Sequence, residues 1–138
     1  MTFFIDTSVV MYAAGGEHPL KGPCARIIAL IGEGGLDATT SVEVVQEILH
    51  RYRAIGRTGI GAEQASRTLD LFAPVLPITH ALMRRVPDLA ARYPSLASRD
   101  LVHIATCVHE GIPDIVSADR GFDAVTEIRR IAPEEFAA

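Results

Sequence analysis

The chain has 138 residues, of which 49% are hydrophobic, and its formal net charge is −4. A chain of this length buries roughly two-thirds of the surface that its unfolded form exposes, so we expect a single domain with a real core over residues 1–138. The acidic balance argues against a broad DNA-binding surface. It suits an enzyme that gathers carboxylates around metal ions, or a protein that binds a basic partner.

The two cysteines and the hydropathy pattern bear on the compartment. Cys24 and Cys107 form no metal-ligand spacing and are typical of small buried residues in a reduced, cytosolic protein. No apolar run approaches the roughly 20 residues that a membrane span needs, and the N-terminus lacks the basic start of a signal peptide. We therefore expect a cytoplasmic protein with no membrane partner.

The predicted elements alternate between strands and helices. In chain order they are a strand over residues 2–5, helices over 8–14 and 23–33, a strand over 36–39, a helix from Thr40 or Ser41 to about Ile55, a helix over 62–72, a strand over 75–78, helices over 79–93 and 98–110, and strands over 114–117 and 128–131. Pro77 places the third of these strands near an edge. Such alternation predicts an α/β fold, with a parallel sheet and helices on both faces.

Two acids directly follow predicted strands. Asp6 comes after the apolar run Phe3-Phe4-Ile5, and Asp119 comes after residues 114–117. Open α/β folds bind ligands at the carboxyl edge of their parallel strands, so these two carboxylates are expected to be neighbours. The hydroxyl residues beside them are Thr7, Ser8 and Ser117, and each either caps its turn or orients a carboxylate or a metal-held water.

The helix that follows residue 41 offers two further acids. On a wheel of about 100° per residue, Glu43 and Glu47 share one face, and Glu47 lies nearer the rim of the apolar arc. An acid at that rim can point into a cleft while its helix packs. Solvated helix acids are the alternative for both, and the pattern leaves open which of the two belongs to a site.

Asp100 has an unusual position in the helix over residues 98–110. Ile104 and Cys107 flank it on the wheel, so its carboxylate falls inside the apolar arc. Carboxylates are seldom placed on a buried face without a partner. A favourable helix dipole explains an acid in the first turn but not this orientation.

Together these positions predict one carboxylate cluster of Asp6, Glu47, Asp100 and Asp119, with Glu43 and Asp123 in reserve. Clustered carboxylates need compensation, and a divalent cation supplies it. Ligands that are all oxygen favour Mg²⁺ or Mn²⁺ over zinc. Such a site suits phosphodiester hydrolysis, in which metal ions activate a water and steady the leaving oxygen.

Four motifs in this order resemble those of PIN-domain ribonucleases, and the chain's size is similar to that of VapC-like toxins from toxin–antitoxin pairs. The motifs are Phe4-Ile5-Asp6-Thr7-Ser8-Val9, Glu47-Ile48-Leu49, Asp100-Leu101-Val102-His103-Ile104-Ala105, and residues 116–123, Val-Ser-Ala-Asp-Arg-Gly-Phe-Asp. The resemblance covers nearly the whole chain. It implies a PIN-like three-layer sandwich with a central parallel sheet of about four to five short strands.

The same resemblance implies an activity, a cofactor and partners. It implies an endoribonuclease that depends on Mg²⁺ or Mn²⁺, with Asp6 and Asp100 as metal ligands and Glu47 and Asp119 as further ligands. Ser8 matches the hydroxyl position of the first motif, while Asp123 is a fifth acid without an assigned role. The resemblance also implies a homodimer, neutralised by a small antitoxin whose tail enters the active-site groove.

Basic residues near the acids are candidates to contact RNA phosphates. We single out Arg51, Arg99 and Arg120, although an exposed arginine on a solvated helix face is the ordinary interpretation of any one of them.

Other functions fit parts of the pattern. His50 and His103 follow Glu47 and Asp100 with the carboxylate-x-x-His spacing of di-iron bundles. That fold needs four long helices, so we expect both histidines at the surface or behind the ligands. A haloacid-dehalogenase-like phosphotransferase has a second Asp where this chain has Ser8. A PIN-like module that binds RNA or a partner without cleavage, or another metal-dependent phosphohydrolase, remains the alternative.

Overall fold

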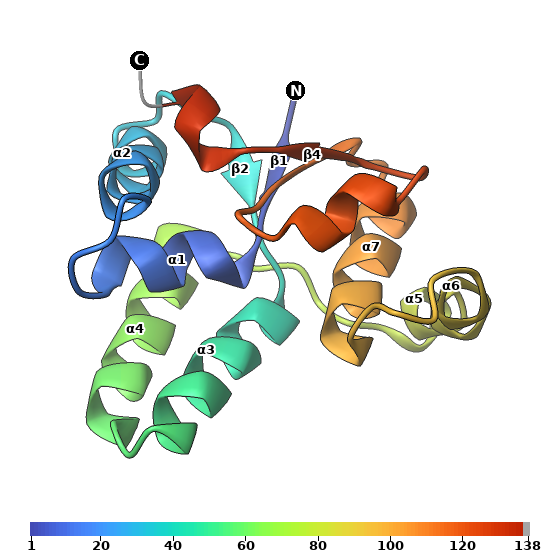
Figure 1. The fold of residues 1–138 in the computed structure, drawn as a ribbon, viewed down its shortest axis with the longest axis horizontal. Helices are drawn as coiled ribbons and strands as arrows, with labels where there is room; N and C mark the ends of the chain where they lie inside the picture. Colours follow the sequence, from blue (N-terminus) through green and yellow to red (C-terminus); the bar gives the residue numbers. More distant parts are fainter. Residues whose placement is uncertain (137–138) are drawn as a thin grey trace.

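The computed structural model describes residues 1–136 and has a four-stranded parallel sheet at its centre (Figure 1). The strands are β1 (Phe3–Ile5), β2 (Ala38–Thr39), β3 (Asp114–Val116) and β4 (Arg129–Ile131), in the spatial order β2-β1-β3-β4. β1 pairs with β3 through Phe4 and Ile115, and both side chains are fully buried. Central parallel strands are covered on both faces, which explains why β1 is apolar at every position.

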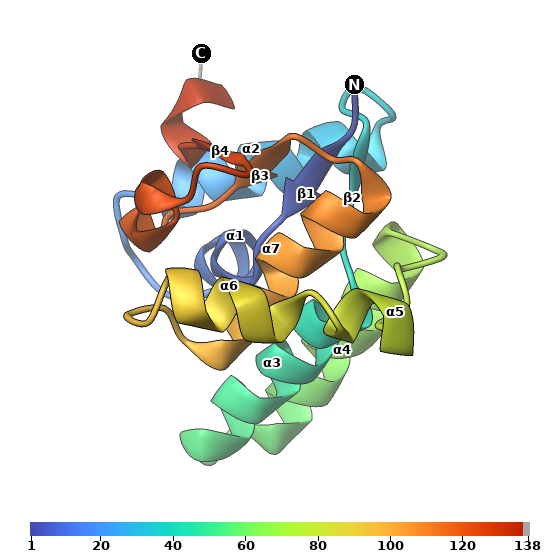
Figure 2. The same cartoon turned by 90° about the vertical axis from the view of Figure 1, so that its right-hand side faces the viewer.

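Helices cover both faces of the sheet (Figure 2). They are α1 (Thr7–Ala14), α2 (Lys21–Gly32), α3 (Val42–Ala54), α4 (Thr58–Leu71), α5 (His80–Met83), α6 (Val86–Arg92) and α7 (Ser98–Glu110), with the 3₁₀ helices η1 (Arg120–Ala124) and η2 (Pro133–Phe136). Successive strand side chains point to opposite faces. Phe4 therefore packs with α3, α5, α6 and α7, whereas Ile5 packs with α1 and α2. The predicted three-layer α/β architecture is confirmed.

Two predicted elements are wrong in detail. Residues 75–78 do not join the sheet and form only a single bridge between Leu76 and Ser41. Pro77 has no amide hydrogen to offer a ladder, so the sheet has four strands. The helix expected over residues 79–93 is two helices, α5 and α6. Pro87 breaks it, because proline cannot donate back to the preceding turn and instead opens α6.

Other boundaries agree more closely. Cys24 and Cys107 are buried and unpaired with each other, as expected. The helix predicted over residues 62–72 begins earlier, at Thr58, just after the turn at Gly56, whose φ is +72°. Within residues 1–136 every helix is too short or too polar to cross a membrane.

Candidate active site

A cavity of about 590 Å³ lies at the carboxyl edge of the sheet, and all four acids of the predicted cluster line it. They come from four separate parts of the chain: Asp6 follows β1, Glu47 lies on α3, Asp100 lies on α7, and Asp119 follows β3. The remaining lining residues are Ser8, Met11, Tyr12, Arg51, Ile55, Arg99 and Ala118. The strand-end acids meet here because β1 and β3 are parallel neighbours.

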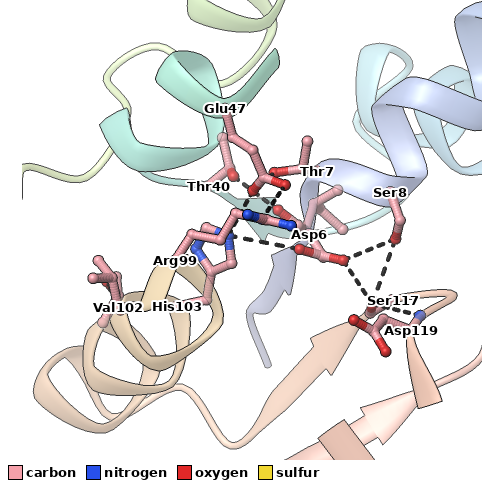
Figure 3. Close-up of polar contacts among 12 residues, drawn as sticks. Asp6, Thr7, Ser8, Thr40, Glu47, Arg99, Val102, His103, Ser117 and Asp119 are labelled. Atoms are coloured by element: carbon pink, nitrogen blue, oxygen red, sulfur yellow. Dashed lines mark hydrogen bonds and ion pairs between the residues drawn. The ribbon is translucent and has the colours of Figure 1, made fainter. Parts of the chain in front are cut away.

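Two serine hydroxyls orient Asp6, which is 5% exposed (Figure 3). Ser8 and Ser117 donate to the same oxygen, Oδ2, over 2.8 and 2.6 Å. The two serines also accept backbone hydrogen bonds, from Ala118 and Asp119 respectively. Each hydroxyl therefore has two roles, because it caps the turn after β3 and also orients the carboxylate of Asp6. Oδ1 of Asp6 is left facing the interior of the site.

Asp119 begins η1 and is exposed, in contrast to Asp6. Its Oδ1 accepts a hydrogen bond from the backbone of Gly121 over 2.8 Å. The residue thus caps the turn that opens η1, and it also lines the cavity. Its second carboxylate oxygen remains available for a ligand in the cavity.

Glu47, at 5% exposure, is the glutamate of α3 that lines the cavity. Its Oε1 accepts from Thr7 Oγ1 over 2.7 Å, and its Oε2 lies 3.0 Å from Arg99 Nε. Burial by itself raises the pKa of Glu47, but the hydrogen bonds with His103 and Thr7, together with the charge of Arg99, outweigh burial and hold that pKa below its usual range. Both carboxylate oxygens of Glu47 are therefore engaged by the protein.

Glu43 lies one turn earlier on α3 and is half-buried. Burial is the main reason why the pKa of Glu43 is raised, and the charge of Glu47 adds to it. The helical wheel placed the two glutamates on one face, but only Glu47 lines the cavity, together with Arg51 on the next turn of α3.

Asp100 is half-buried in the first turn of α7, as its place in the apolar arc predicted. Burial raises the pKa of Asp100 to about 6, and the charges of Asp6 and Asp119 add to that rise. Repulsion from two other acids means that the carboxylates share one electrostatic environment.

The predicted position of His103, at the surface or behind the ligands, was only partly right. It is not at the surface: its side chain is fully buried, and Nε2 lies 3.3 Å from Glu47 Oε1 and 3.7 Å from Asp6 Oδ1. Burial alone lowers the pKa of His103, yet the hydrogen bond to Glu47 and the charges of Asp6, Glu47 and Asp100 raise it overall.

A signal for this burial was present in the sequence. Residues 101–107 contain no charged side chain, and all seven are buried. Because α7 packs between the sheet and α5–α6, it has no solvated face over this stretch (Figure 2). His50 on α3 is exposed, as expected.

Asp123 and the arginines occupy different places. Asp123 is exposed and pairs with Arg130, whose Nη1 also donates to the backbone oxygen of Ser117 over 2.9 Å. Asp123 therefore supports the turn after β3 through Arg130, from outside the cavity. Arg51 and Arg99 line the cavity with their side chains about half exposed, whereas Arg120 is an exposed residue of η1.

The cavity fits a divalent cation chemically. Asp6, Asp100 and His103 each offer a ligand atom, and these atoms all lie within 4.8 Å of one another. Carboxylate oxygens are the ligands that Mg²⁺ and Mn²⁺ prefer. A cation bound there would compensate the mutual repulsion that raises the pKa of Asp100.

The PIN domain family matches residues 3–128. Ribonuclease VapC13 of Mycobacterium tuberculosis and VapC ribonuclease Mb1869c of Mycobacterium bovis are each 36% identical over 128 residues, covering 93% of this chain and 98% of each relative. Ribonuclease VapC7 of Mycobacterium tuberculosis is 32% identical over 131 residues, covering 94% of this chain and 90% of the relative.

Solved structures share the fold at lower identity. VapBC2 from Rickettsia felis, bound to a DNA fragment from its promoter, superposes with a TM-score of 0.74 at 11% identity and covers 96% of this chain and 98% of that chain. FitAcB from Neisseria gonorrhoeae superposes with a TM-score of 0.72 at 20% identity and covers 97% of this chain and 99% of that chain.

Proposed function

This chain belongs to the PIN-domain family, among the VapC ribonucleases, and we propose that it is a metal-dependent endoribonuclease that serves as the toxin of a toxin–antitoxin pair. The observation that carries the proposal is the meeting of Asp6, Glu47, Asp100 and Asp119 at one cavity. The reaction is hydrolysis of RNA phosphodiester bonds. Family membership supports the ribonuclease activity, and the acid cluster supports its dependence on metal.

In this proposal Asp6 and Asp100 hold Mg²⁺ or Mn²⁺, while Asp119 and Glu47 complete the acidic set. An ion held by these residues would supply Lewis-acid chemistry, which lowers the pKa of a water molecule and polarises a phosphoryl oxygen. Ser8 and Ser117 hold Asp6 in one orientation, so its free Oδ1 is already placed toward the interior of the site. Preorganisation of this kind lowers the cost of assembling the reactive geometry.

The arginines at the cavity wall suit a polyanionic substrate. Arg51 and Arg99 both lie beside Oε2 of Glu47, at 3.9 and 3.0 Å. One carboxylate cannot accept from every N–H donor of two guanidinium groups, so several of these donors remain unused. We propose that this pair contacts an RNA phosphate, and that Arg120 on η1 meets the same strand further from the acids.

A small antitoxin and a second copy of this chain are the proposed partners. The VapC ribonucleases that the chain resembles support the antitoxin, and the solved relatives named VapBC2 and FitAcB show the same fold. The proposed location is the cytoplasm.

Cleavage of a mixed RNA pool tests the proposal. We expect antitoxin-free protein to cut RNA with Mg²⁺ or Mn²⁺ and to stop in EDTA. Asp6→Asn should lower the rate at least about 100-fold, because it removes an ionised ligand while leaving the side chain's size unchanged. Folded protein that binds RNA but never cuts it would favour the non-catalytic module instead, and cleavage that persists in Asp6→Asn would contradict the assigned site.

A further inference from the structure

His103 lies at the centre of the acid cluster without belonging to the predicted acidic set. Its imidazole packs against Phe4 of β1, with ring centroids 5.6 Å apart, and is completely buried. Figure 3 shows it between Asp6 and Glu47. A side chain enclosed in this way has little freedom to rotate, so the two ring nitrogens have fixed surroundings.

The two nitrogens differ sharply. Nε2 faces two carboxylate oxygens, at 3.3 Å from Glu47 and 3.7 Å from Asp6. Nδ1 is buried and has no hydrogen-bond partner among the described residues. A lone pair on Nε2 would face two anions, whereas a proton on Nε2 is attracted to both. A proton on Nδ1 alone would be a buried donor without an acceptor.

We propose that His103 is a positioning residue and not a metal ligand. In this proposal Nε2 stays protonated and donates a hydrogen bond to Glu47, with Asp6 as the second acceptor. This inference rests on the proposed function for the role of the metal. Histidine binds a metal through an unprotonated nitrogen and usually donates from its other nitrogen to a neighbouring acceptor. At His103 no such acceptor lies beside Nδ1 in the described part of the chain.

The consequence is a chain of contacts that joins three elements. Thr7 of α1 and His103 of α7 both contact Oε1 of Glu47 on α3. The same imidazole faces Oδ1 of Asp6, the oxygen that the serines leave free. His103 thereby sets the distance between Asp6 and Glu47, and Glu47 acts through its neighbours more than by direct contact with an ion.

Nitrogen-15 NMR of the full chain tests the proton's position directly, because two-bond correlations distinguish protonated from unprotonated ring nitrogens. We expect His103 to carry a proton on Nε2 in the metal-free protein and to retain it when Mg²⁺ is added to saturation. The exposed histidines His18, His50, His80 and His109 are references in the same spectrum. A proton on Nδ1 alone, or loss of the Nε2 proton when Mg²⁺ binds, overturns the proposal.

The same spectra separate this proposal from the proposed function. If Mg²⁺ leaves the backbone resonances of Asp6 and Asp119 unchanged, metal binding at the cavity fails, while the metal-free spectrum still decides whether Nε2 is the donor.

Variants supply a second measurement. His103→Leu removes the donor at similar volume, and we expect it to weaken Mg²⁺ binding about 10–100-fold in calorimetric titration. His103→Gln keeps an N–H donor and should recover most of that loss, whereas the exposed control His50→Leu should bind Mg²⁺ as the unaltered chain does. Unaltered Mg²⁺ affinity in folded His103→Leu, or a Gln variant no better than Leu, contradicts the proposal. Should either variant fail to fold, the spectra of the unaltered protein decide.

Discussion

At the scale of a single residue, Asp100 shows that bringing the acids together lowers the stability of the folded protein at neutral pH. Its pKa of about 6 lies above the ordinary 3.8 because burial and the charges of Asp6 and Asp119 oppose ionisation. The folded protein therefore binds this proton more tightly than the unfolded chain does. The stabilisation is fully present below about pH 4 and is lost as pH rises through about 6. At neutral pH the ionised carboxylate works against folding unless a cation compensates it.

Asp100→Asn should consequently stabilise the metal-free protein. Without the repelled charge, we expect its melting temperature in EDTA at neutral pH to rise by about 2–5 °C. The variant should also lose the pH dependence between about pH 4 and pH 6. Thermal denaturation followed by circular dichroism across that range is the measurement. Asp70→Asn, an exposed acid on α4, is the control. A melting temperature that falls in Asp100→Asn would show that the carboxylate makes favourable contacts instead.

At the scale of elements, α3 forms one wall of the cavity through Glu47 and Arg51, with Ile55 directly after its end. α4 packs beside α3 as the second helix of a hairpin (Figure 1). The two helices approach closely at Gly61. A Cβ added there would lie 2.7 Å from the Cβ of Tyr52, a distance at which something must shift. The absence of a side chain at Gly61 therefore sets the spacing of the hairpin.

Gly61→Ala should destabilise the protein by about 1–3 kcal/mol, since an extra methyl in a tight contact forces the helices apart. Gly59→Ala is the matched control on the same helix, because nothing lies within 4 Å of its added Cβ. It should be stabilising by about 0.4–1 kcal/mol through the lower entropy of the unfolded chain. Urea denaturation compares the two. Equal effects of the two substitutions would mean that the hairpin yields easily at Gly61.

At the scale of the whole molecule, the cavity joins parts of the chain that are far apart in sequence. Asp6 and Asp119 are brought together by the β1–β3 pairing, and Asp100 is brought to them by the packing of α7. Unfolding separates these acids, so the unfolded chain has no comparable site. An ion that binds the cavity should therefore stabilise the entire fold.

Mg²⁺ should raise the melting temperature of the unaltered chain. A ligand at 100 times its dissociation constant adds about 2.7 kcal/mol when it binds only the folded form. Melting in Mg²⁺ is compared with melting in EDTA at matched ionic strength. Asp6→Asn should abolish most of the shift. An equal shift in that variant would place the bound ion elsewhere on the molecule.

Sequence reasoning reached much of the fold because its signals are local. Apolar runs followed by Asp6 and Asp119 indicated strand ends, and the parallel arrangement then placed both acids on one edge. The wheel position of Asp100 indicated a carboxylate turned toward a buried face. Two predicted elements were wrong because each contains a proline that interrupts regular backbone hydrogen bonding. Pro77 keeps residues 75–78 out of the sheet, and Pro87 divides a predicted helix.

The sequence by itself determined the layered α/β architecture, the PIN resemblance and the four acids that line the cavity, since these depend on periodicity and on residue types at strand and helix ends. Only the tertiary structure decided that Glu47 and not Glu43 lines the cavity, that Arg99 pairs with it, and that His103 is buried between two carboxylates. Those outcomes depend on which elements pack around a side chain. No spacing along a single helix contains that information, because the neighbours come from β1, α3 and α7, which meet only in the folded chain.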